Sequence, residues 1–134
     1  MNVLWLQTAG CGGCTMSLLC AEDPNVFDLL AGAGVRFLWH PALSLESGEE
    51  VRAILAGIES GEIALDVLCI EGAIATGPKG TGRYQMLSGT GVSLLDWVRR
   101  LAPRARCGGG GHLRHLWRRD HRGRKSVGGG RRAI

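Results

Sequence analysis

The stretch that decides the fold is VLWLQTAGCGGCTMSLLCA, residues 3–21. It opens with a wholly apolar run at residues 3–6, typical of a strand that is covered on both faces in a parallel sheet. A CGGC motif follows at residues 11–14, and residues 15–21 have helical composition. The sequence therefore predicts a strand, a glycine-rich turn that carries two thiols, and a helix.

Strands and helices continue to alternate after this unit, which indicates an α/β fold with a doubly wound parallel sheet and flanking helices. In such a sheet, ligands bind at the carboxyl ends of the strands. A further strand should follow the last helix, beyond Pro103. The other expected elements are a helix near residues 26–30, a strand at 35–40, a helix at 51–58 capped by Ser47, a strand at 65–70 and a helix at 94–101 capped by Ser93.

Charge divides the chain into two parts. The 134 residues carry a net charge of +4, but residues 1–107 carry −3 and residues 108–134 carry +7. The second part also holds three of the four histidines. We therefore expect a single folded domain at 1–107 and a basic tail, rich in Gly, Arg and His, at 108–134.

The compartment is predicted from the first residues and from the cysteines. The chain enters an apolar run directly, without a basic segment or a twin-arginine signal, so we expect a cytoplasmic protein. No apolar stretch approaches the ~20 residues that span a bilayer, so a membrane role is not expected. Five cysteines is an odd number, and metal binding or burial is a better explanation than disulfides.

The pair Cys11 and Cys14 is the main candidate site. Two thiols at this spacing between a strand and a helix can bind a metal or an iron–sulfur cluster, and the intervening glycines let the backbone approach it. The same spacing suits a dithiol redox pair, and the thiols can also be inert. The spacing alone leaves these three alternatives open.

Other candidate side chains can be explained by packing or by local structure. Cys20, in an apolar helix, and Cys69, within a strand, are expected to be small buried residues rather than ligands. Trp39 and His40, at a strand end, are expected to pack. Glu71 directly follows a buried strand, where a carboxylate can either order a loop or touch a site.

A glycine-rich segment at residues 72–91 has no periodicity, and loops of that length are usually functional or disordered. Its GPKGTGR stretch, residues 77–83, invites comparison with a phosphate-binding loop. It lacks the order G-x-x-x-x-G-K-[ST], and no helix clearly begins there. We therefore reject nucleotide binding by this loop.

Besides the stretch at residues 3–21, the chain contains LWHP at residues 38–41 and CIEG at residues 69–72. Together with GTGR at residues 80–83, these motifs resemble the small subunit of nickel–iron hydrogenases, over residues 2 to about 106. Within that family, three features most resemble the cytoplasmic, hydrogen-sensing regulatory type: the glycine- and cysteine-rich start, the SLESG stretch at residues 44–48 and the missing export signal. The motifs that carry the resemblance are VLWLQ at residues 3–7, GCGGCTMSLL at 10–19, LWHP at 38–41, CIEG at 69–72 and GTGR at 80–83.

The resemblance implies a flavodoxin-like domain that holds the proximal 4Fe-4S cluster and conducts electrons. Its partner would be a large subunit that splits dihydrogen at a nickel–iron site, with a signalling kinase or redox partner beyond it. Cys11 and Cys14 would be two of the four cluster ligands, and Glu71 would lie near the cluster. This subunit would carry no catalytic residue of its own.

The family's other ligands follow in a Gly-Thr-Cys-Ala segment and in an Asn-Pro loop, and this sequence contains neither. We therefore expect an incomplete domain that binds no stable cluster and is inactive as written. Residues 107–122 can be back-translated with synonymous codons and read again with the reading frame moved forward by one nucleotide. A choice of codons then exists that encodes a strand followed by Gly-Thr-Cys-Ala. The hypothesis is a frameshift near codon 106.

Two other functions compete with this interpretation. A basic tail with Trp117 could contact nucleic acid, but it lacks a recognised binding fold, so we do not expect this function. A small dithiol redox protein that uses Cys11 and Cys14 is the second alternative.

Overall fold

The computed structural model describes residues 1–80, 84–87 and 89–106. It contains a parallel sheet of three strands in the order β2-β1-β3. The strands are β1 (Asn2–Gln7), β2 (Arg36–Trp39) and β3 (Val67–Glu71), and the α-helices are α1 (Gly13–Leu19), α2 (Glu49–Ser60) and α3 (Leu94–Leu101). The predicted α/β class is confirmed. The expected fourth strand and the basic tail fall on residues outside the described ranges.

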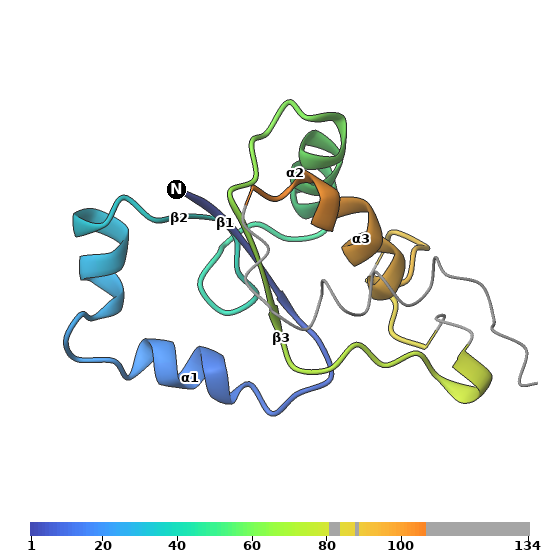
Figure 1. Ribbon diagram of the computed structural model, residues 1–134, viewed down its shortest axis with the longest axis horizontal. Coiled ribbons are helices and arrows are strands. Elements are labelled where there is room, and N and C mark those ends of the chain that lie inside the picture. Colours follow the sequence, from blue (N-terminus) through green and yellow to red (C-terminus); the bar gives the residue numbers. More distant parts are fainter. Residues whose placement is uncertain (81–83, 88, 107–134) are drawn as a thin grey trace, which may run out of the picture.

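The two faces of the sheet are covered differently. Figure 1 shows α2 and α3 on one side of the strands and α1 on the other. Strand residues Leu4, Leu6 and Leu68 turn toward α2 and α3 and are almost fully buried, together with Leu55, Ile58 and Leu101 of those helices. Burying each such side chain contributes about 1.5–3 kcal/mol. On the α1 side, Trp5 and Cys69 are only half-buried, so the expectation of two covered faces holds for one face.

The two predicted helix caps differ in outcome. Ser93 caps α3, because its hydroxyl oxygen accepts the backbone N–H of Asp96 at 3.1 Å. Ser47 does not cap α2: the residue before that helix is Gly48, and no side chain bonds to the first turn. The acidic residues Glu49 and Glu50 instead occupy the positive end of the helix dipole.

The helix expected near residues 26–30 is short and exposed. It forms a five-residue π-helical turn, η1 (Asp28–Gly32), preceded by Phe27, whose side chain is 75% exposed. Two 3₁₀ turns, η2 (Pro78–Gly80) and η3 (Ala102–Arg104), complete the described elements. None of the helices in the described ranges combines the length and the apolar character needed to cross a membrane.

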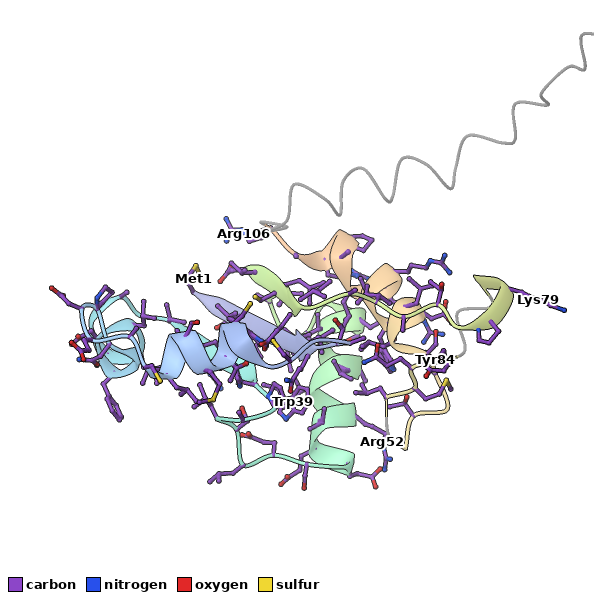
Figure 2. All side chains as sticks on the ribbon, turned by 90° about the horizontal axis from the view of Figure 1, so that it is seen from below. Met1, Trp39, Arg52, Lys79, Tyr84 and Arg106 are labelled. Atoms are coloured by element: carbon purple, nitrogen blue, oxygen red, sulfur yellow. The ribbon has the colours of Figure 1, made fainter. Side chains whose placement is uncertain are left out.

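The amino ends of the strands are tied together at one end of the molecule. The backbone N–H of Asn2 donates to the Asp66 carboxylate at 2.8 Å, and that of Arg106 donates to the carbonyl of Leu65 at 3.1 Å. Figure 2 shows Met1 and Arg106 at this end and Lys79 at the other. The loops that follow β1 and β3 therefore share the carboxyl edge of the sheet.

Candidate functional site

The loops after β1 and β3 are joined by backbone hydrogen bonds. The N–H and the hydroxyl of Thr8 both donate to the carbonyl of Glu71, at 2.8 and 2.7 Å. Ala9 and Ala73 exchange two backbone bonds of 3.0 and 3.1 Å. Gly72 lies between these contacts with φ +92°, and a Cβ there would lie 2.8 Å from the carbonyl oxygen of Ala9. The two loops thus form one support at the carboxyl edge.

The turn at residues 11–14, which carries Cys11 and Cys14 and is called the thiol turn below, follows directly from this support. Gly12 adopts the left-handed conformation, φ +76°, and lies directly before α1, so the chain reverses sharply between the strand and the helix. Cys11 and Cys14 are both exposed on the turn. A Cβ at Gly13 would lie 3.2 Å from the Sγ of Cys11, which leaves little room for a larger residue. The glycines therefore present both thiols at the surface.

A buried carboxylate holds the beginning of α1. Glu71 is only 3% exposed, and its Oε1 accepts the backbone N–H of Thr15 at 3.0 Å. Its Oε2 accepts the Thr15 hydroxyl and the indole N–H of Trp5, the latter at 3.0 Å. The hydrogen bonds from Thr15 are the main cause of a pKa of Glu71 below its usual value, and those from Trp5 and the Cys14 backbone lower it further. Glu71 is therefore a carboxylate that orders the residue next to Cys14.

Sequence reasoning missed Thr15 and Trp5, the donors to this carboxylate. A tryptophan in an otherwise aliphatic strand was the available signal, because a buried indole N–H needs an acceptor. Thr15 gave no comparable signal, since its partner is 56 positions away in the sequence.

The structure places the other predicted residues as follows. The expectation of burial is wrong for Cys20, which is exposed where α1 ends. Cys69 is half-buried, and burial raises the pKa of its thiol, followed by the charges of Cys14 and Glu71. His40 is fully buried and contacts aromatic rings, which confirms packing.

An iron–sulfur cluster of the kind implied by the sequence needs four thiolates. Cys11 and Cys14 have the right chemistry and exposure for two of them. Within the described ranges, however, no three His, Cys, Asp or Glu side chains are arranged to hold a metal ion. This part of the chain therefore provides a thiol pair and does not complete a cluster site.

Two other regions carry no cysteine among their described residues. The segment expected not to bind phosphate forms a 3₁₀ turn at Pro78–Gly80, and residues 81–83 lie outside the described ranges. An open groove at the amino ends of the strands is lined by Asn2, Arg36, Glu46 and Glu62, among others, and no cysteine lines it. The chemistry-bearing side chains lie at the carboxyl edge.

Comparison with known proteins adds a family to this geometry. The family model described as NADH ubiquinone oxidoreductase, 20 kDa subunit, matches residues 11–107. The periplasmic [NiFeSe] hydrogenase small subunit of Desulfomicrobium baculatum is 31% identical over 111 residues, which cover 77% of this chain and 34% of that protein. The cytochrome c3 hydrogenase small chain of Acidithiobacillus ferrooxidans is 49% identical over 37 residues, which cover 28% of this chain and 92% of that sequence.

Among solved structures, the actinobacterial-type NiFe-hydrogenase from Ralstonia eutropha has a TM-score of 0.66 and 29% identity. The match covers 81% of this chain and 34% of that one. The chain thus spans about a third of the length of the Desulfomicrobium and Ralstonia proteins.

Proposed function

The chain belongs to the family described as NADH ubiquinone oxidoreductase, 20 kDa subunit, and on this premise we propose that it is the thiol-bearing domain of a nickel–iron hydrogenase small subunit. In this role it would carry electrons between a dihydrogen-splitting large subunit and iron–sulfur clusters. Its hydrogenase relatives support the proposal. The reaction served would be dihydrogen oxidation, and the chemistry of that reaction would take place on the partner.

One observation carries the proposal more than any other. Two exposed thiols stand on a glycine turn at the carboxyl edge, and a buried carboxylate from the neighbouring strand fixes the residue that follows the second thiol. A pair of surface thiols on a rigid support is suited to bind one edge of a metal cluster, because the ligand positions are set before the metal arrives.

The proposed ligands are Cys11 and Cys14, and a 4Fe-4S cluster completed by two further thiolates would supply one-electron transfer. The chain's own residues provide the support for that group. The backbone bonds between the loops keep the turn in place, and Glu71 holds Thr15 through its N–H and its hydroxyl.

We also propose a biological role and a partner for this chain. A cytoplasmic, hydrogen-sensing role, with a signalling kinase or a redox protein as a further partner, is supported by the resemblance of the glycine- and cysteine-rich start and of residues 44–48 to the sensing type. We also propose that the chain as written is inactive without two more thiolate ligands. The large subunit as partner is supported by the hydrogenase relatives.

Iron loading tests the proposal in two parallel samples. The first is the full chain after anaerobic reconstitution with iron and sulfide. The second is a fusion of residues 2–106 to the remaining part of the Desulfomicrobium small subunit, which supplies the other ligands. We expect well under four irons per chain in the first sample and about four additional irons, with the brown absorption of a 4Fe-4S cluster, at the joined site of the second.

Substitutions identify the ligands in the fusion. Cys14→Ser should abolish the additional cluster, whereas Cys20→Ser, which changes an exposed thiol at the opposite end of α1, should leave it intact. A folded fusion that gains no iron would contradict the proposed function. About four irons in the unfused chain would contradict the proposal that it is inactive for lack of ligands.

The exposure of both thiols also favours a second candidate, a dithiol redox protein. Such a protein would oxidise the two thiols to a disulfide while it reduces a disulfide in its substrate. It would reduce insulin disulfides without iron and lose this activity in Cys14→Ser. Iron-free insulin reduction by the full chain would favour this candidate.

A further inference from the structure

Each strand of the sheet brings one chemical group to the carboxyl edge. β1 leads to the thiol turn, β3 ends at Glu71, and β2 is followed directly by His40. His40 is fully buried, although histidine carries two polar ring nitrogens. The proposed function uses the first two groups and leaves this histidine unexplained.

The surroundings of His40 hold its ring in one place. Its Nδ1 accepts the backbone N–H of Ala42 at 3.0 Å, and the backbone N–H of His40 donates to the Ser44 hydroxyl oxygen at 2.9 Å. Because Nδ1 accepts, the proton of the neutral ring belongs on Nε2. That atom is buried and has no hydrogen-bond partner among the described residues. A phenylalanine would avoid an unpaired donor, so filling space does not by itself account for histidine.

The ring of His40 lies against the residue that holds Glu71. Its centroid is 5.0 Å from that of Trp5 and 5.3 Å from that of Phe37, and Trp5 and Phe37 meet edge to face at 6.4 Å. The indole N–H of Trp5 then donates to Glu71. An indole side chain can adopt several staggered rotamers, and the two rings lie where they can hold the one whose N–H donates to Glu71.

We propose that His40 is a positioning residue of the thiol site: its ring fixes the Trp5 indole, which in turn fixes the Glu71 carboxylate and the beginning of α1. The chain of contacts runs from the turn after β2, through β1, to the end of β3. All three strands thereby support the thiol turn. This inference deepens the proposed function, because it concerns the support of the same two thiols.

Electrostatics agree with this placement. Burial lowers the pKa of His40, and the negative charge of Glu71 opposes that shift, so the two groups lie within electrostatic reach of one another. A neutral His40 forms no ion pair with Glu71, so the carboxylate depends on the hydrogen bonds that the rings help to aim.

Two substitutions separate the ring from its hydrogen bond. His40→Phe keeps an aromatic ring against Trp5 and loses the acceptor for Ala42. His40→Asn keeps an acceptor near the position of Nδ1 and loses the ring. If His40 served only to close the turn, the Phe variant would be the damaging one.

The readout is the indole N–H of Trp5 in the iron-free full chain, followed by ¹H–¹⁵N NMR and assigned with Trp5→Phe. We expect His40→Asn to speed solvent exchange of this proton about tenfold or more, and to speed exchange of the Thr15 amide as well. His40→Phe should stay within about twofold of the parent for both protons.

Equal acceleration in both variants, acceleration in the Phe variant alone, or no change in either would overturn the proposal. Should the Asn variant fail to fold, His40→Leu, which keeps apolar bulk without an aromatic ring, takes its place. Because no metal is used, failure here is distinct from failure of the iron-loading experiment.

Discussion

The Oε1 atom of Glu71, at the end of β3, lies 3.0 Å from the backbone nitrogen of Thr15 in the first turn of α1. This bond connects α1 to β3, a strand that is not its neighbour in the sequence. The carboxylate is buried and charged, and hydrogen bonds to a charged acceptor are stronger than those between neutral groups. The bond is therefore a principal link between the sheet and the thiol turn.

Glu71→Gln should destabilise the chain by about 1–3 kcal/mol, because the new amide presents N–H groups to donors that need an acceptor. Denaturant unfolding followed by tryptophan fluorescence measures the loss. The control is Glu62→Gln, which changes the same side chain at an exposed position and should have little effect. Equal stability of the two variants would show that the Glu71 carboxylate does not hold α1.

The same carboxylate predicts how stability depends on pH. The pKa of Glu71 is lowered from its ordinary value of 4.5 in the folded chain, so its stabilisation is complete above that pH. It is lost as the pH falls from 4.5 through the lower, folded pKa. Unfolding free energies measured across this range should converge for the parent and for Glu71→Gln. A constant difference between them down to pH 2 would contradict the pKa shift.

His40 adds a second acid-sensitive contribution at higher pH. Its folded pKa lies below the ordinary 6.5, so the unfolded chain binds the proton first and stability declines as the pH falls below 6.5. His40→Phe, which cannot titrate, should remove the part of the decline that lies between pH 6.5 and the range of Glu71.

The junction between the two loops is tested at Gly72. Its φ is +92°, and a Cβ would lie 2.8 Å from the Ala9 carbonyl oxygen, which belongs to backbone that cannot move aside freely. Gly34 is a matched control, because its φ is +62° and a Cβ there would meet nothing within 4 Å. Gly34→Ala should cost about 1–2 kcal/mol for the left-handed conformation alone.

Gly72→Ala should cost that amount and about 1–3 kcal/mol more for the close contact. Thermal or denaturant unfolding of the two variants gives the comparison. If both variants lose the same stability, the backbone conformation accounts for the whole effect and the close approach of the loops does not matter.

Local patterns predicted much of the fold, and long-range contacts account for what they missed. The apolar run before the CGGC motif predicted β1, and Ser93 predicted the beginning of α3, because both signals are local in sequence. Ser47 failed as a cap because Gly48 stands one position closer to the helix. The predicted burial of Cys20 was wrong because an apolar helix composition does not reveal which side of α1 the sheet covers.

The candidate site shows the same division. The two thiols were predicted from their spacing, and Glu71 from its place after a buried strand. The role of the carboxylate depended on Thr15 and Trp5, whose contacts with Glu71 span 56 and 66 residues. A contact of this kind has no periodicity to detect, so it becomes visible only when the sheet brings the strand ends together.

The four cysteines in the described ranges should differ in reactivity toward a thiol-alkylating reagent. Cys11, Cys14 and Cys20 are exposed, whereas Cys69 is half-buried with a raised pKa. Because the thiolate is the reacting species, both burial and a raised pKa slow the reaction. Near neutral pH we expect Cys69 to react about tenfold or more slowly than the other three, measured by mass spectrometry of proteolytic peptides. In urea the alkylation rates of the four cysteines should converge. The same measurement on Glu71→Gln tests the contribution of the Glu71 charge, which is one of the charges that raise the Cys69 pKa. Reaction of Cys69 in the native chain at the rate of Cys20 would mean that partial burial does not protect the Cys69 thiol.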